Sequence, residues 1–172
     1  YKQNAIDGFT SLVSKFPKSP YAPSALAQIG TIWMILKDPE KAQAALTRLQ
    51  KEYPTSPEAN NVDYMIGDSM LKLGRPKEAR DAFKRMFEQA GGKYTEIQIL
   101  TAGDELFKSK EYEIAHQAFN KILETTKDPK IKELALVKDG SALVEMGNAE
   151  EAIKALEDLF KLYPKSAYTI DG

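Results

Sequence analysis

The stretch FPKSPYAPSALAQIG occupies residues 16–30, and a similar stretch, YPTSPEANNVDYMIG, occupies residues 53–67. Both begin with an aromatic residue followed by Pro-x-Ser-Pro, and both end in glycine. A third copy begins as YPKS at residues 163–166. Because a phrase that returns at a wide, regular interval is typical of repeat proteins, the whole chain is expected to follow an internal period.

The period becomes visible when the chain is aligned on a glycine that is followed twelve residues later by an alanine. The pairs are Gly30/Ala42, Gly67/Ala79, Gly103/Ala115 and Gly140/Ala152, with spacings of 37, 36 and 37 residues between glycines. Large apolar residues stand four and seven residues after each alanine, namely Leu46, Leu49, Phe83, Met86, Phe119, Ile122, Leu156 and Leu159. Because such spacings return to one side of an α-helix, the pattern predicts a helix around each alanine.

Helix start and stop signals divide each repeat into two helices. In KDPEKA (37–42), Asp38 is a good N-cap residue and Pro39 suits the first helical position. The other breaks carry similar signals: Gly74 with Pro76, and Gly147 with Asn148 as N-cap and Glu151 as its capping-box partner. Each repeat is therefore predicted to be a pair of antiparallel helices.

The Pro-x-Ser-Pro phrase is predicted to connect successive repeats. Its first proline ends one helix, its serine (Ser19 or Ser56) caps the next helix, and its second proline (Pro20 or Pro57) takes the first helical position. The small pair of each repeat has a steric interpretation: glycine on the first helix and alanine on the second allow the two helices to cross closely. The cost is about 1 kcal/mol of helix propensity per glycine.

The spacing of Gly, Ala, large apolar residue and Pro resembles the tetratricopeptide repeat, whose usual length is about 34 residues. Here the extra residues lie in the connector between repeats, from Pro17 to Gly30 and from Pro54 to Gly67. This long connector is similar to that of bacterial envelope proteins of the outer-membrane assembly lipoprotein (BamD-like) and Tol–Pal accessory (YbgF-like) families. The resemblance implies an all-α, right-handed solenoid of antiparallel helix pairs with about nine helices.

The predicted organisation is a single array over residues 1–172. It contains a half repeat at 1–18, repeats at about 19–55, 56–92, 93–129 and 130–166, and the start of a further repeat at 167–172. Because both ends fall inside a repeat, the chain is interpreted as a fragment of a longer protein. The predicted core residues are Phe9, Leu12, Ile29, Trp33, Leu46, Leu49, Ile66, Phe83, Phe119, Ile122, Leu156 and Leu159.

The composition argues against several classes of partner. Lys and Arg number 24 and Asp and Glu 25, so the basic surface expected of a nucleic-acid-binding protein is missing. The longest mainly apolar run, residues 29–36, has eight residues, far short of the roughly 20 that a membrane-spanning helix needs. With no cysteine, thiolate metal sites are excluded.

The sequence contains no recognisable catalytic or cofactor motif, so the chain is predicted not to be an enzyme and to carry no metal or cofactor. His116 is the only histidine and has no second ligand of its kind, which favours a surface or packing role. Gly91, Gly92 and Lys93 lack the Ser or Thr and the preceding strand of a phosphate-binding loop, which favours a turn between repeats.

The resemblance implies a concave groove lined by the first helix of each repeat, for which the family's groove positions identify candidate residues. In the first repeat these positions hold Ser24, Ala27, Thr31 and Met34. The predicted peptide-binding residues are Asn61, Tyr64, Asp68, Leu71, Leu100, Asp104, Phe107, Val137 and Ser141. The alternative is that several side chains at such positions, especially Leu134 and Val144, pack against neighbouring helices.

The function that follows is a non-enzymatic scaffold that binds a peptide or helical segment of a protein partner. Apolar anchors such as Tyr64 and Phe107, together with Asp68 and Asp104, suit an amphipathic segment with a basic residue. The connector favours a bacterial periplasmic or outer-membrane-associated location, and the alternative is cytoplasmic. A second hypothesis is an architectural spacer or oligomerisation module that self-associates through the cut ends of the array.

Overall fold

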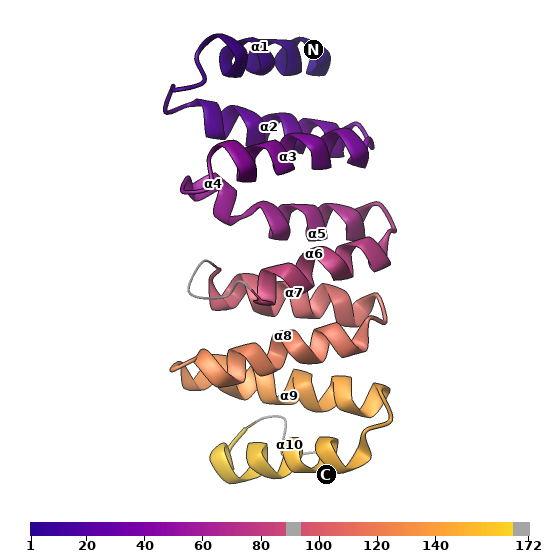
Figure 1. Ribbon diagram of the computed structural model, residues 1–172. Helices are drawn as coiled ribbons and strands as arrows, with labels where there is room; N and C mark the ends of the chain where they lie inside the picture. Colours follow the sequence, from indigo (N-terminus) through magenta and orange to yellow (C-terminus); the bar gives the residue numbers. More distant parts are fainter. Residues whose placement is uncertain (89–93, 167–172) are drawn as a thin grey trace. The chain divides into compact units, whose positions relative to one another are not determined.

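In the computed structural model, residues 1–88 and 94–166 are described, and they form ten α-helices without a β-strand. The bounds are α1 Lys2–Lys15, α2 Ala22–Ile35, α3 Pro39–Glu52, α4 Pro57–Asn60, α5 Val62–Lys72, α6 Pro76–Glu88, α7 Glu96–Lys108, α8 Tyr112–Thr125, α9 Pro129–Glu145 and α10 Ala149–Leu162 (Figure 1). The all-α prediction is confirmed. The described residues form one helix more than the nine expected, because the single turn α4 is separated from α5 at Asn61.

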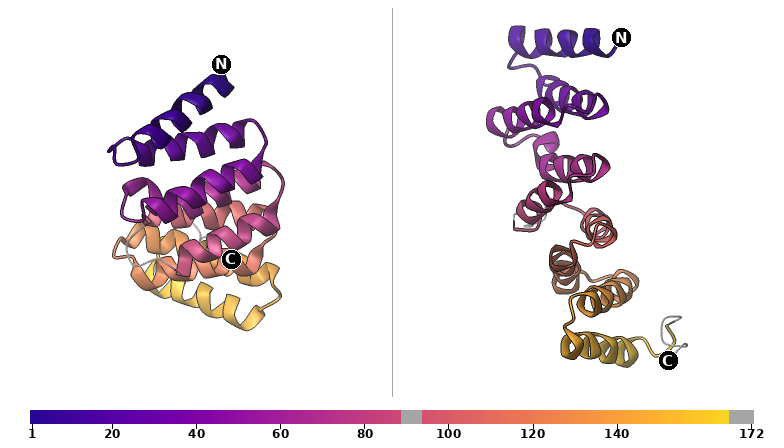
Figure 2. Two further views of the ribbon diagram at one scale, coloured as in Figure 1. Left: turned by 45° about the horizontal axis from the view of Figure 1, so that its top comes forward. Right: turned by 90° about the vertical axis from the view of Figure 1, so that its right-hand side faces the viewer.

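The chain forms two compact units, unit 1 (Tyr1–Ala82) and unit 2 (Phe83–Gly172). In unit 1, α2 packs against both α1 and α3, and α3 packs against α5. In unit 2, α7, α8, α9 and α10 pack consecutively, each against the next. Figures 1 and 2 show that, apart from the single turn α4 that leads into α5, successive helices inside a unit run antiparallel, as predicted from the repeat.

The glycine on which each repeat was aligned (Gly30, Gly67, Gly103 or Gly140) is called the reference glycine. All four repeats end their first helix in the same left-handed conformation, seven residues after it. The residues are Lys37 (φ 59°), Gly74 (φ 72°), Lys110 (φ 63°) and Gly147 (φ 78°). In each case the next amide donates to the carbonyl five residues back, as from Asp38 to Trp33 at 3.0 Å. This is the Schellman motif, in which glycine is favoured because it has no Cβ. Gly74 and Gly147 are therefore helix stops, as predicted.

Two of the reference glycines, Gly30 and Gly103, lie beneath large side chains of the second helix, whereas the predicted close contact was with alanine. A Cβ placed on Gly30 would lie 2.7 Å from Leu46, and one on Gly103 would lie 2.6 Å from Phe119. Leu46 and Phe119 stand four residues beyond the alanines that were expected to make this contact. At both glycines the large residue of the second helix, and not the alanine of the repeat, supplies the nearest atom.

The helix caps follow the predictions only in part. Asp38 and Ser56 accept hydrogen bonds from the backbone amides of Lys41 and Ala59, both at 3.1 Å, and Pro57 takes the first helical position as predicted. Asn148 occupies the N-cap position of α10, but its side chain makes no cap hydrogen bond, which contradicts the predicted capping box.

The first connector also departs from its predicted cap, because α2 begins at Ala22 instead of Pro20. Pro23 lacks an amide proton and fits only in the first turn of a helix, so a helix that started at Pro20 would miss a hydrogen bond there. The aromatic residues of the three phrases nevertheless end their helices alike, with φ and ψ of −132° and 59° at Phe16, −133° and 53° at Tyr53, and −131° and 63° at Tyr163. Tyr53 Oη donates to the carbonyl of Pro17 at 2.8 Å, which joins the first two connectors.

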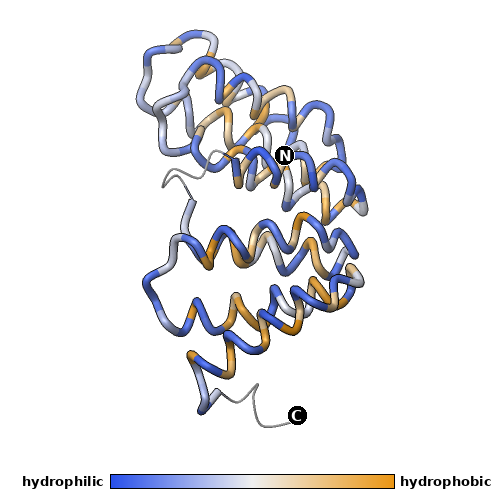
Figure 3. The backbone as a smooth tube through the Cα atoms, turned by 60° about the horizontal axis from the view of Figure 1, so that its bottom comes forward, coloured by the Kyte–Doolittle hydropathy of each residue, from blue (hydrophilic) through white to orange (hydrophobic). Residues whose placement is uncertain are grey.

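The apolar core follows the predicted faces, and hydrophobic and hydrophilic positions alternate along the helices in Figure 3. Eight of the twelve predicted core residues are buried: Ile29, Leu46, Leu49, Ile66, Phe83, Phe119, Ile122 and Leu159. Phe9, Leu12 and Trp33 are half-buried. The prediction for Leu156 is wrong, since this residue of α10 is 41% exposed although it borders Gly140 of α9.

Within residues 1–88 and 94–166, every helix is too short or too polar to span a bilayer. The predicted turn at Gly91, Gly92 and Lys93 and the predicted start of a further repeat at 167–172 lie outside the described residues. The repeat boundaries themselves stay predictions.

Candidate functional site

The predicted groove residues fall on the first helices of the repeats, in both units. In unit 1, Asn61 precedes α5, and Tyr64, Asp68 and Leu71 lie on it; in unit 2, Leu100, Asp104 and Phe107 lie on α7, and Val137 and Ser141 lie on α9. All of them are partly or fully exposed. Val144 is exposed as well, although it was a candidate for burial against a neighbouring helix.

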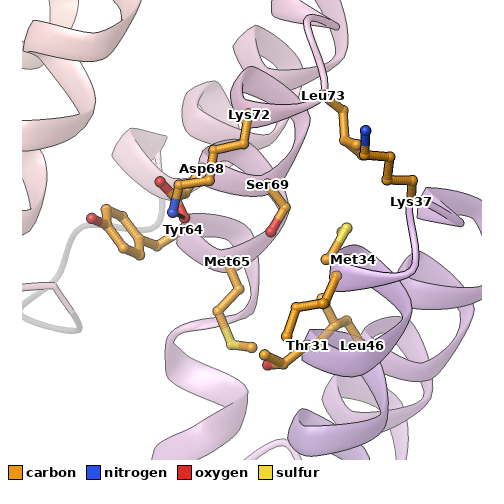
Figure 4. A pocket seen from close by; sticks show the side chains of 11 residues that line it. Thr31, Met34, Lys37, Leu46, Tyr64, Met65, Asp68, Ser69, Lys72 and Leu73 are labelled. Atoms are coloured by element: carbon orange, nitrogen blue, oxygen red, sulfur yellow. Dashed lines mark hydrogen bonds and ion pairs between the residues drawn. The ribbon is translucent and has the colours of Figure 1, made fainter. Parts of the chain in front are cut away.

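A pocket of about 400 Å³ opens in unit 1 between α2 and α5. Its walls are Thr31, Met34, Ile35 and Lys37 from α2 and the turn after it, Leu46 from α3, and Tyr64, Met65, Asp68, Ser69, Lys72 and Leu73 from α5 and its C-terminal end (Figure 4). Tyr64 and Asp68 were predicted groove residues, as were Thr31 and Met34. Asn61 and Leu71 do not line this pocket.

The interior of the pocket is apolar and adaptable. Figure 4 shows Met65 of α5 reaching toward Thr31 of α2, and Met34 of α2 and Leu46 of α3 line the same pocket. The hydroxyl of Thr31 donates to the carbonyl of Ala27 in its own helix at 3.0 Å, so it places no unsatisfied donor in the pocket. Methionine side chains are flexible and polarisable, and they can adjust to an apolar group of varied shape.

Charged side chains form the rim of this pocket. Lys72 Nζ lies 2.6 Å from Asp68 Oδ2, one helical turn apart on α5. Lys37 extends from the left-handed turn that follows α2. The rim therefore carries two lysines and one carboxylate, and that carboxylate holds one of the lysines.

Two groove residues of unit 2, Asp104 and Phe107, contact neighbouring side chains. Asp104 Oδ1 on α7 lies 2.6 Å from Lys138 Nζ on α9. The ring of Phe107 packs edge-on against Tyr112, with centroids 5.3 Å apart. Burial, together with the adjacent Glu145 carboxylate, raises the pKa of Tyr112. The two acids that were expected to attract a basic partner, Asp68 and Asp104, thus each already hold a lysine.

His116 joins α8 to α9 in unit 2. Its Nδ1 lies 2.6 Å from Oδ1 of Asp139, and the amide nitrogen of Asn120 lies 2.9 Å from its Nε2. Asp139 is only 4% exposed, and burial raises the pKa of its carboxyl against the opposing effect of the imidazole. A hydrogen bond that satisfies a buried carboxylate agrees with the packing role inferred from the sequence.

Four side chains of the pocket and its ion pairs were not predicted from the sequence: Lys37, Met65 and Lys72 in unit 1 and Lys138 in unit 2. The prediction used only the family's groove positions, and these four residues lie between or beyond them. A signal was available, because Met65 and Lys138 both stand two residues before a reference glycine. Comparing that offset between the second and fourth repeats would have identified a position that is apolar in one and charged in the other.

Comparison with known proteins supports both the fold and the cellular context. The model of the YfiO family, described as an outer membrane lipoprotein, matches residues 1–172. A search of curated protein sequences gives no significant match.

Solved structures with a similar fold include two of MamA. They share 20% identity with this chain, with TM-scores of 0.56 and 0.55; the matches cover 99% and 97% of this chain and 87% and 91% of those chains. A tetratricopeptide repeat protein from Parabacteroides merdae has 16% identity and a TM-score of 0.53, over 98% of this chain and 70% of that one. At such identities these structures support the fold alone, and they agree with the predicted tetratricopeptide-like architecture.

Proposed function

The chain belongs to the YfiO family of outer membrane lipoproteins, and we propose that it binds a segment of a partner protein in the pocket between α2 and α5. Family membership confirms the predicted envelope location at the periplasmic face of the outer membrane. It also gives the chain a non-enzymatic, protein-interacting role, as predicted. What we propose beyond this is that the pocket is where the partner segment binds, and which chemistry that segment has.

The apolar interior of the pocket is the observation that carries this proposal. Its volume of about 400 Å³ suits one or two large apolar side chains of a bound segment. Met34, Leu46 and Met65 would bury such side chains without leaving a buried polar group unsatisfied. Grooves that bind an amphipathic segment through spaced apolar anchors are a common mode of peptide recognition.

The rim favours an acidic residue beside the apolar anchor. Asp68 is neutralised by Lys72 at 2.6 Å, which leaves Lys37 as the additional charge on the rim of this pocket. A carboxylate of the bound segment would be attracted to this rim, while a basic residue would compete with Lys72 for Asp68. The proposed ligand is therefore an apolar segment with an adjacent acidic residue, in place of the basic residue expected from the sequence.

Site-directed photo-crosslinking tests the proposal in the envelope. A photoreactive phenylalanine at position 65 should crosslink one protein partner, while the same group at the exposed Gln43 on α3, outside the pocket, should not. The crosslinked segment, made as a synthetic peptide, should bind the purified protein. Met65→Glu should weaken that binding at least tenfold, and Gln43→Glu should leave it unchanged. Equal crosslinking at both positions, or equal affinity of both variants, would contradict the proposal.

Self-association is the second candidate function, favoured by the exposed apolar face of α10. Ile153 and Phe160 are 57% and 46% exposed, seven residues apart on that helix. Glu150 and Glu151 lie in its first turn and Lys161 in its last, so an antiparallel pair of α10 helices would bring opposite charges together. Light scattering tests this candidate: a dimer that Phe160→Glu dissociates supports it, and a monomer at high concentration contradicts it.

A further inference from the structure

We infer that the Asp104–Lys138 ion pair closes, in unit 2, the position that is open as a pocket in unit 1, and that this pair restricts apolar docking to unit 1. The inference rests on the proposed docking function of the pocket. It assigns a role in specificity to two side chains outside the pocket itself.

The two positions are equivalent in the repeat. Asp104 directly follows Gly103 as Thr31 follows Gly30, and Lys138 stands two residues before Gly140 as Met65 stands two before Gly67. In unit 1 the first helices of consecutive repeats are α2 and α5, and in unit 2 they are α7 and α9. Both pairs of first helices are in contact. The same place between neighbouring helices is therefore occupied by Thr31 and Met65 in unit 1 and by Asp104 and Lys138 in unit 2.

The Asp104–Lys138 ion pair of unit 2 spans the space between α7 and α9. Lys138 Nζ on α9 lies 2.6 Å from Asp104 Oδ1 on α7, and their side chains are 27% and 32% exposed. An apolar group that entered here would have to separate the two charges or cover them, and both steps are unfavourable in a partly buried setting.

The corresponding residues of unit 1 present no such barrier. Thr31 satisfies its hydroxyl within its own helix, and the thioether of Met65 carries no charge. A second difference lies four residues after the reference glycine, where Met34 is replaced by Phe107. The ring of Phe107 is held edge-on by Tyr112, so this wall of unit 2 is less adaptable than the methionine wall of unit 1.

Methyl NMR with a small apolar anion tests the inference. The protein has five methionines, so ¹³C-methyl methionine labelling gives few and assignable signals. Met34 and Met65 report on the unit 1 pocket, and Met146 reports on the equivalent place in unit 2, where it corresponds to Leu73. With 8-anilinonaphthalene-1-sulfonate as the probe, the wild type should show shifts at Met34 and Met65 and none at Met146.

The double variant Asp104→Thr/Lys138→Met copies the residues of unit 1 into unit 2. It should bind a second equivalent of the probe, with shifts at Met146 and at the introduced methionine. Arg48→Met/Glu52→Thr, which removes the exposed ion pair of α3 at 2.7 Å, is the matched control and should bind one equivalent. Unchanged signals of the buried Met70 and Met86 verify that each variant is folded.

The outcomes separate the inference from the function on which it rests. Wild-type shifts at Met34 and Met65 with no second site in the double variant would overturn the inference and leave the unit 1 pocket standing. Wild-type shifts at Met146 would also overturn it, because unit 2 would then be open despite its ion pair. No wild-type shift at Met34 and Met65 would count against the pocket itself.

Discussion

A Cβ atom on Gly103 would lie 2.6 Å from Cε1 of Phe119, so the aromatic ring occupies the space that any other side chain at position 103 would need. Gly30 has the same relationship with Leu46, at 2.7 Å. Gly140 differs, because the nearest atoms to its Cβ position belong to Ala155 and Leu156, at 3.8 and 3.9 Å. A side chain in place of Gly30 in α2 or Gly103 in α7 would therefore have to displace a neighbour, whereas one in place of Gly140 in α9 would not.

Alanine substitution should reveal this difference. Gly103→Ala should lower the free energy of unfolding by about 1–3 kcal/mol, because the buried ring of Phe119 has to move. Gly140→Ala should be neutral or should raise it by up to about 1 kcal/mol, because alanine is the better helix former and has room. Urea unfolding followed by circular dichroism measures both. Equal effects at the two positions would show that close approach is not what glycine provides.

The left-handed turns give a second matched comparison. Gly147→Ala should destabilise the protein by about 1 kcal/mol, although its Cβ would meet no atom within 4 Å, because the backbone at φ 78° disfavours a Cβ. Lys110→Gly should have the opposite effect, since Lys110 adopts φ 63° at the equivalent position. The same urea unfolding measures both. A stabilising Gly147→Ala would be incompatible with the Schellman turn described above.

The N-cap residues of α4 and α10 should respond differently to alanine. Ser56→Ala removes the hydrogen bond from the amide of Ala59 and should cost about 1 kcal/mol. Asn148→Ala should change stability by less than about half of that, because its side chain makes no cap hydrogen bond. Thermal unfolding of the two single variants checks this, and a larger loss for Asn148→Ala would contradict the structure.

The buried carboxyl of Asp139 predicts a pH dependence of unit 2. Burial raises its pKa, so its favourable contribution to folding is complete below about 3.8 and is lost as the pH rises through the raised value. The comparison is best made without the coupled imidazole, between His116→Ala and His116→Ala/Asp139→Asn. The stability of the first variant relative to the second should fall as the pH increases from about 4 upward. A difference that stays constant or grows over that range would refute the assigned direction.

Repeat spacing predicted the fold well because the relevant interactions are local and recur. The helix faces, the stops at Gly74 and Gly147 and the cap at Ser56 were all visible as offsets. The start of α2 was misplaced because a single residue, Pro23, overrides the signal at Ser19. Leu156 was misplaced because burial depends on a helix on both sides of the residue, and a repeat pattern carries no information about which side is covered.

The candidate site was only partly predictable, because a pocket depends on how two helices combine. Tyr64 and Asp68 were identified from family positions, and both line the pocket. Their partners were not: the Lys72 that holds Asp68 and the Lys138 that holds Asp104 matter only through side-chain geometry. The left-handed Lys37 and Lys110 were likewise hidden, because lysine is not a residue that predicts that conformation.

Methionine-methyl NMR with the crosslinked segment as a peptide is the most direct test of whether the pocket between α2 and α5 binds a protein segment. The peptide should shift the Met34 and Met65 signals over the same concentration range in which it binds, while the signals of the buried Met70 and Met86 stay in place. Binding that leaves Met34 and Met65 unchanged and perturbs other residues would contradict it.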